Sequence, residues 1–85
     1  MKVWYCNDPL NKPTLKEAQK FVDGYVEVLR ISDDMQLIVN EEGLLRDDLQ
    51  VNVQATKLAR AAKYSVGGAG IVGNAIILEG GACWD

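Results

Sequence analysis

The sequence contains no histidine and only two cysteines, Cys6 and Cys83, which lie near opposite ends of the 85-residue chain. Histidine is the usual general base and, with cysteine, the usual ligand of structural zinc, so its absence disfavours both kinds of site. The cysteines form no C-x-x-C pair, and we expect reduced thiols, with a bridge between the two ends as the alternative. The sequence predicts no metal and no cofactor.

Long apolar runs are also missing, as are long blocks of one charge. No segment reaches the ~18 apolar residues of a membrane helix, and the N-terminus lacks a signal-peptide pattern, so we expect a cytoplasmic protein without membrane contact. Nine Lys and Arg against twelve Asp and Glu give a net charge of -3. This balance disfavours a dedicated nucleic-acid binder, which needs a net basic surface, and the isolated acidic pairs disfavour a DNA mimic.

What is present is the composition of one small globular domain spanning residues 1–85. Hydrophobic residues make up 48% and charged residues 25% of the chain, which is enough to fold but leaves a thin core. Such a core typically gives little net stability, so we expect the chain to bury further area as a homodimer.

The first part of the chain predicts a strand and a helix. Lys2–Cys6 has the aromatic and β-branched residues typical of a strand. Thr14 and Glu17 form a capping-box pattern, so a helix is expected to begin there and to end near Gly24.

The hydrophobic period then changes to two, which predicts a hairpin of strands Tyr25–Ile31 and Met35–Asn40 around a two-residue loop. The more apolar face carries Val26, Val28, Leu37 and Val39, and the mixed face carries Tyr25, Glu27, Leu29, Ile31, Gln36, Ile38 and Asn40. On this assignment Leu29 and Ile38 form a patch that water reaches, and such a patch commonly marks an interface. We therefore expect the dimer or partner contact there, with Glu27 opposite Asn40.

The second half predicts a helix and a last strand. Asn52 can cap a helix that runs to about Tyr64. Residues 65–70 are expected to form a turn, and Ile71–Leu78 a strand that is apolar on both faces and therefore central. The order β-α-β-β-α-β predicts an α+β fold with two helices packed on one face of a sheet of about four strands. The ferredoxin-like split fold is one topology with this order.

Residues 68–73 match the pattern G-x-G-x-x-G, but a dinucleotide site is not expected. That fingerprint needs a strand before it and a helix after it, so that the pyrophosphate meets free amides at a helix N-terminus. Here a predicted helix precedes and a predicted strand follows, which favours a simple glycine turn.

Glu27, Glu41 and Glu42 are the only candidates for acid–base chemistry. Adjacent residues on a turn diverge, so Glu41 and Glu42 are more typical of a solvated turn than of a catalytic pair. Glu27 lies inside an apolar strand, where it is expected to pair with Lys or Arg or to contact a ligand. Without a histidine to activate a serine or cysteine, we expect no enzyme.

The predicted second helix carries a basic ridge of Lys57, Arg60 and Lys63. Such a ridge is usually the solvated side of an amphipathic helix, and the alternative is contact with an acidic partner or a phosphate. Trp4 and Trp84 near the chain ends either pack together or anchor a partner.

Four blocks along the chain, at residues 24–28, 37–43, 52–56 and 71–74, read GYVEV, LIVNEEG, NVQAT and IVGN. In this order they resemble a family of short uncharacterised proteins of phages and other mobile elements in bacteria. The resemblance covers residues 21–78 and leaves out the strand 2–6 and the tail 79–85. It implies a domain of unknown function that acts in the bacterial host cytoplasm, and it implies no catalytic residue.

The residues and the resemblance together predict a non-enzymatic phage-type protein that binds a host protein, and so alters host metabolism or inhibits a defence system. A nucleotide-signal or small-ligand sequestering protein is the first alternative, and a nucleic-acid-associated accessory factor is the second. The expected binding residues are Tyr25, Glu27, Leu29, Ile38, Asn40, Glu41, Glu42, Thr56, Lys57, Arg60 and Asn74.

Overall fold

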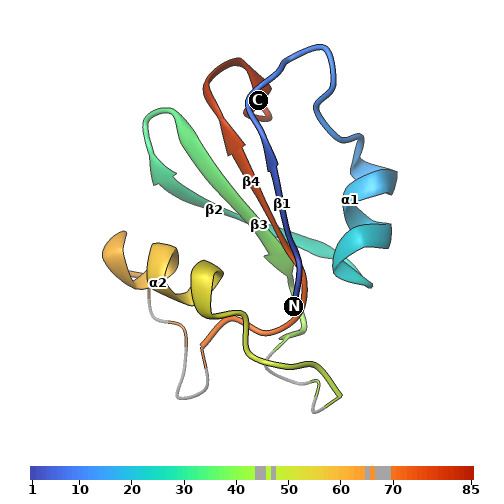
Figure 1. Ribbon diagram of the computed structural model, residues 1–85, viewed down its shortest axis with the longest axis vertical. Coiled ribbons are helices and arrows are strands. Elements are labelled where there is room, and N and C mark those ends of the chain that lie inside the picture. Colours follow the sequence, from blue (N-terminus) through green and yellow to red (C-terminus); the bar gives the residue numbers. More distant parts are fainter. Residues whose placement is uncertain (44–45, 47, 65, 67–69) are drawn as a thin grey trace.

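The computed structural model describes residues 1–43, 46, 48–64, 66 and 70–85. The elements are β1 (Val3–Cys6), α1 (Leu15–Val22), β2 (Val26–Ser32), β3 (Met35–Asn40), α2 (Val53–Ala61), β4 (Ala75–Glu79) and the short 3-10 helix η2 (Gly80–Ala82) (Figure 1). The predicted α+β class and the order β-α-β-β-α-β are confirmed. Most of the predicted turn at 65–70, and the first two residues of the glycine pattern at 68–73, lie outside the described residues.

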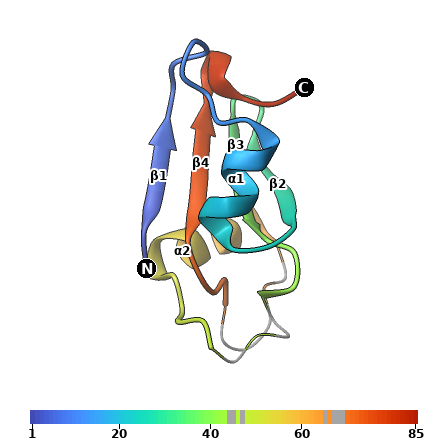
Figure 2. The same ribbon diagram turned by 90° about the vertical axis from the view of Figure 1, so that its right-hand side faces the viewer.

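The strands form one mixed sheet in the order β1-β4-β3-β2 (Figure 2). β4 pairs in parallel with β1 and antiparallel with β3, and β3 pairs antiparallel with β2. The last strand is therefore central, as predicted, and β1 and β2 are the two edges. The ferredoxin-like fold has β1 and β3 as its central strands, so that topology does not describe this sheet.

The two helices cover opposite faces of the sheet, so the prediction that both lie on one face is wrong (Figure 2). The reason is that both central strands are apolar on both sides. Leu37 of β3 and Ile77 of β4 belong to the hydrophobic cluster beside α2, whereas Ile38 and Ile76 belong to the cluster beside α1. Each face therefore needs its own helix to exclude water.

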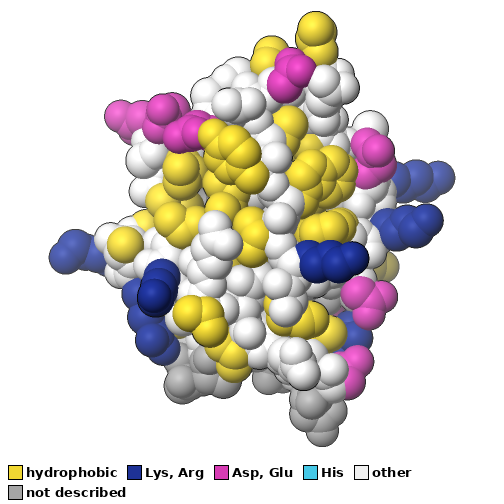
Figure 3. Space-filling view, viewed as in Figure 1, with side chains coloured by type: hydrophobic (Ala, Val, Ile, Leu, Met, Phe, Trp, Pro, Cys, Tyr) yellow, Lys and Arg dark blue, Asp and Glu magenta, His cyan; other side chains and the backbone are white. Residues whose placement is uncertain are grey.

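In Figures 1 and 3 the β1 edge of the sheet faces the viewer. In Figure 2, which is turned by 90°, the same edge lies on the left. Hydrophobic side chains gather across the middle of this side, and most charged side chains lie at its margins (Figure 3). Tyr5 of β1 is 51% exposed. The open edge of β1 therefore lies within an apolar part of the surface.

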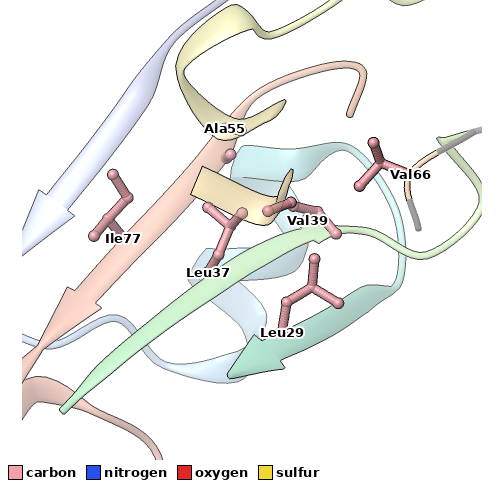
Figure 4. Packing of buried hydrophobic residues seen from close by; sticks show 8 residues of the cluster. Leu29, Leu37, Val39, Ala55, Val66 and Ile77 are labelled. Atoms are coloured by element: carbon pink, nitrogen blue, oxygen red, sulfur yellow. The ribbon is translucent and has the colours of Figure 1, made fainter. Parts of the chain in front are cut away.

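The core beside α2 is aliphatic (Figure 4). Leu29, Leu37 and Val39 of the sheet pack beside the helix. Ala55 and Ala59 are fully buried, and these small side chains let α2 lie close to the strands. The aromatic side chains of Trp4, Phe21 and Trp84 pack against the core beside α1.

A β-bulge in β2 shifts the hairpin by one residue relative to the prediction. The turn is two residues long, as expected, but the register changes between Arg30 and Ser32. Glu27 is therefore paired with Val39 and not with Asn40. Side chains alternate between the two faces along a strand. One extra residue in β2 therefore moves the side chains from Val26 to Arg30 to the opposite face from the one predicted by the pairing with β3.

The predicted N-terminal caps of both helices are confirmed. Thr14 Oγ1 accepts a hydrogen bond from Glu17 N at 3.1 Å, and Glu17 Oε1 accepts one from Thr14 N at 2.9 Å. Asn52 Oδ1 accepts from Ala55 N at 3.1 Å. Each bond satisfies an amide that has no partner within its helix. α1 ends at Val22, and the next residue, Asp23, adopts the left-handed conformation (φ 63°), one residue before the predicted stop.

β4 begins at Ala75, later than the strand predicted at 71–78. Gly73 has a φ of +85°, which is incompatible with a continuous extended strand. Val72 forms only an isolated bridge with Val51. In the described part of the chain, no helix combines the length and apolar content that crossing a bilayer requires.

Leu37→Ala and Ile38→Ala are each expected to lower the free energy of unfolding by about 2–5 kcal/mol, because each variant empties part of a different core. Both side chains are fully buried, whereas Val28 is 42% exposed, so Val28→Ala is the matched control. Urea unfolding followed by circular dichroism measures all three changes. A loss for Leu37→Ala or Ile38→Ala as small as that of the control would show that one sheet face is open to water.

Candidate functional site

A cavity of about 170 Å³ opens on the α2 side of the sheet, beside β2 and the last residues of β3. Its buried apolar lining comes from Leu29, Val39, Val66 and Val72. The other described lining residues are Glu27, Asn40, Glu41, Gly43, Tyr64, Gly70 and Ile71. A space of this size suits one side chain and falls below the ~300–1,000 Å³ of most small-molecule sites.

Two exposed carboxylates lie at this cavity. Glu27 pairs across the sheet with Val39. Glu41 directly follows β3 and donates its N–H to Tyr25 O at 2.8 Å, so both glutamates lie at the same end of the hairpin. The expected pairing of Glu27 with Lys or Arg is not among the ion pairs of the described residues. No described lining residue is Lys or Arg. The cavity therefore combines an apolar lining with negative charge.

Tyr64 lies beyond the end of α2, not within that helix as predicted. Its hydroxyl accepts a hydrogen bond from Arg30 N at 2.9 Å and donates one to Arg30 O at 3.0 Å. Both backbone groups of Arg30 therefore point away from β3. Tyr64 occupies the outer edge of β2 at this position.

The backbone groups of Val26 and Val28 face the same outer edge. Donor and acceptor directions alternate along an antiparallel strand, so these residues point the same way as Arg30. A hydrogen bond from Glu41 N to Tyr25 O at 2.8 Å agrees with this alternation. It shows that the carbonyl group of Tyr25 points towards the β3 side, so the backbone groups of the next residue, Val26, point outward. Within the described part of the chain, no hydrogen bond engages the outward backbone groups of either valine.

Exposed apolar side chains flank this edge. Val28 is 42% exposed and Tyr25 is 68% exposed. Val28 pairs with Ile38, which belongs to the cluster beside α1, so Val28 lies on the α1 side of the sheet. A strand added here would therefore meet an apolar side chain on one face and the cavity on the other.

A family model described as a domain of unknown function, DUF3846, matches residues 5–83, nearly the whole chain. The chain belongs to this family. The match extends beyond residues 21–78, to which the sequence resemblance was limited, and it includes half of β1 and all of η2. No curated protein and no solved structure matches the chain.

The patch predicted from Leu29 and Ile38 is not at the surface of the DUF3846 domain. Leu29 is 8% exposed and Ile38 is 0% exposed. They belong to the clusters on opposite sides of the sheet, because the bulge in β2 exchanges the faces. A dimer or partner contact cannot lie at the patch that the sequence predicts.

Asn40 joins the end of β3 to the end of α1. Its Nδ2 donates to the carbonyl oxygens of Val22 and Asp23 at 3.0 and 3.1 Å, and its Oδ1 accepts from Glu42 N at 2.8 Å. The residue is 6% exposed. Its side chain points towards α1, away from the α2 side on which Glu27 lies, so the predicted polar site of Glu27 and Asn40 is not formed.

Thr56 and Asn74 also hold the DUF3846 fold together. Thr56 Oγ1 donates to Asn52 O at 2.8 Å and accepts from Ile71 N at 2.9 Å, which ties α2 to the segment before β4. Asn74 Nδ2 donates to Phe21 O at 3.1 Å. Both side chains therefore form hydrogen bonds within the chain, as that of Asn40 does.

The predicted basic residues Lys57 and Arg60 are exposed on α2 and do not line the cavity beside β2. Among the described residues, no three His, Cys, Asp or Glu side chains come together as a metal site requires. The positive charges of α2 and the negative cavity are thus separate features of the surface.

A second, more open hollow of about 430 Å³ lies beside α1 and is lined by Gln19, Lys20, Gly24, Tyr25, Asn40, Glu42 and Arg46. Arg46 reaches Asp23 Oδ2 at 3.0 Å and Asp48 Oδ1 at 2.8 Å. Hydrogen bonds to Asp48 and to Asp23 raise the pKa of Arg46. The guanidinium is already neutralised, so it offers a ligand less charge than an unpaired arginine.

Arg46 also lowers the pKa of Asp48, mainly through its hydrogen bonds. We expect the Asp48 carboxyl to titrate below its ordinary pKa of 3.8, and Arg46→Gln to return it towards that value. The pair stabilises the fold above the ordinary pKa, and this contribution is lost as the pH falls through the lowered one. Carbon-detected NMR titration of the Asp48 side chain measures the shift, and an unshifted midpoint in the wild type would contradict the assignment.

Asn40→Ala is expected to lower the free energy of unfolding by about 1–3 kcal/mol, because the carbonyl groups at the end of α1 lose their donor. Glu41→Gln, one residue on, is the control, since surface changes are usually within about 0.5 kcal/mol. Urea unfolding of both variants separates the two roles. Equal stability of Asn40→Ala and the wild type would leave Asn40 available as a binding residue instead.

Proposed function

We propose that this DUF3846 domain is a non-enzymatic binding protein that captures an extended segment of another protein as an added strand beside β2. The observation that carries this proposal is the open backbone edge at Val26 and Val28, placed directly beside a cavity with two carboxylates. In strand addition, main-chain hydrogen bonds give affinity and pockets for alternate side chains give specificity. The outward backbone groups of Val26 and Val28 supply the first feature, and the cavity beside β2 supplies the second.

The position of Glu27 specifies the chemistry of the captured segment. Directly opposite residues on neighbouring strands share one face of the sheet, so the partner residue opposite Glu27 projects on the cavity side. There it meets Glu27, Glu41 and the buried lining of Leu29 and Val39. Lys and Arg combine an aliphatic stem with a positively charged end. The stem would contact the apolar lining, and the charged end would lie beside the two carboxylates. The segment therefore carries Lys or Arg at this position.

The same geometry argues against catalysis and against nucleotide capture. Paired carboxylates catalyse when their environments differ, with one held in an apolar place, whereas Glu27 and Glu41 are both exposed. A phosphate needs cationic or amide donors, and the described lining of the cavity includes no Lys or Arg. The cavity also suits a single side chain better than a nucleotide.

The wider role in this proposal is that of a phage-type protein acting in the bacterial host cytoplasm. Resemblance to phage and mobile-element proteins supports this part. The captured segment then belongs to a host protein, and occupying it alters host metabolism or inhibits a defence system.

Peptide binding tests the proposal directly. Two blocked ten-residue peptides, alternating Val and Thr with either Arg or Glu at the centre, are titrated into the labelled protein by NMR. We expect the Arg peptide to shift the amides of Val26 and Val28, and the Glu peptide to bind about fivefold more weakly or not at all. Glu27→Lys is expected to reverse this preference.

Val28→Pro provides the structural control. Proline fits an edge strand where the N–H faces outward, so this change removes one outward donor without breaking the β2–β3 ladder. We expect it to abolish peptide binding while the thermal unfolding transition stays cooperative. Binding of either peptide that survives Val28→Pro, or turnover of a substrate that Glu27→Gln or Glu41→Gln abolishes, would contradict the proposal.

A further inference from the structure

β1 is the second open edge of the sheet. The hydrogen bond from Ala75 N to Lys2 O at 3.1 Å shows that even-numbered β1 residues face β4. The backbone groups of Val3 and Tyr5 therefore point outward, because directions alternate along the strand. In the described ranges, no hydrogen bond engages these outward groups.

β1 lacks the features that protect natural edge strands from pairing. Such edges carry charged side chains, proline or a bulge, or are covered by another group. β2 has most of these, namely Glu27, Arg30, a bulge and the Tyr64 hydroxyl. β1 reads Val-Trp-Tyr-Cys, without charge, proline or bulge. Apolar side chains surround it on the face shown in Figure 3, and Met1 is 51% exposed.

The geometry points to a second copy of this chain as the occupant of the β1 edge. An antiparallel pair of β1 strands about a twofold axis at Trp4 places Val3 of each copy opposite Tyr5 of the other. The outward donors and acceptors of both residues are then satisfied reciprocally. Trp4 faces Trp4 of the second copy on the α1 side, and no like charges meet, because the strand is uncharged.

β2 does not offer the same self-complementarity. Pairing requires its outward residues, Val26 and Val28, to face each other across the twofold axis. That axis passes through Glu27, so Glu27 meets Glu27 of the second copy in the closer type of antiparallel pair, with Cα atoms about 4.5 Å apart. Like charges in this position are destabilising.

Registers displaced from this one in either direction are blocked as well. A twofold axis at Val28 requires the backbone groups of Arg30, which Tyr64 already holds. Moving the axis in the opposite direction requires Gly24, whose N–H bonds to Gln19 O at 3.0 Å. Self-association therefore favours β1 over β2.

The dimer formed in this way is one continuous eight-stranded sheet with β2 at each outer end. Both binding edges of the proposed function remain open and lie far apart, so the dimer presents two sites for extended segments. Two linked sites raise the apparent affinity for a partner that carries two copies of the segment. The dimer itself is inferred from β1 alone and does not rest on the peptide site.

Sedimentation analysis of Val3→Pro and Val28→Pro tests this inference. Each change removes one outward N–H donor, at opposite edges of the sheet. We expect a wild-type dimer at micromolar concentration and a dissociation constant raised about tenfold or more by Val3→Pro, because the twofold axis removes the donor twice. Val28→Pro is expected to remain dimeric while losing peptide binding, so the failure of either proposal can be distinguished from that of the other.

Tyr5→Lys is the second variant in case Val3→Pro unfolds the chain. It adds a charge at an exposed position of the edge, and thermal unfolding checks that the fold is kept. We expect the dissociation constant of the dimer to be raised in this variant as well, because a charged side chain on an edge strand opposes pairing. A monomeric wild type, or a folded Val3→Pro or Tyr5→Lys variant that dimerises as tightly as the wild type, would overturn the inference.

Discussion

The whole structure depends on the burial of both faces of the two central strands. β3 and β4 carry large apolar side chains at successive positions, such as Leu37 and Ile38 or Ile76 and Ile77, and all four are almost completely buried. A single layer of helices on one face would leave half of these side chains in water. α1 and α2 therefore lie on opposite sides of the sheet and cover its central strands. The two edges of the sheet, β1 and β2, lie outside this cover.

Some of this arrangement is predictable from the sequence and some is not. The order of elements, the capping box at Thr14 and the Asn52 cap depend on neighbouring residues, so local patterns predict them. The face of each β2 side chain depends on a bulge before Ser32, which has no local signature. A one-residue shift moves side chains to the opposite face of the sheet. Leu29 and Ile38, predicted to form one exposed patch, are therefore buried on opposite faces.

The candidate site shows the same division. Glu27 and Glu41 stand out in the sequence as charges beside apolar strands, and the structure brings both to one cavity. Asn40 stands out equally, yet its polar atoms serve the end of α1. Tyr64 was expected inside a helix and gave no signal of its role at the edge of β2, because its partner Arg30 is 34 residues away. The two edges thus differ: β2 is charged and partly capped, whereas β1 is apolar and uncapped.

The most direct test of the central claim is amide hydrogen exchange along β2 in the isolated protein. We predict fast exchange at Val26 and Val28, whose N–H groups face water, and slow exchange at Glu27 and Leu29, whose N–H groups face β3. Arg30 is also predicted to exchange slowly, because Tyr64 accepts from its amide. Uniform protection from Val26 to Arg30 would show that the edge is covered, and would contradict an account in which it is the binding surface.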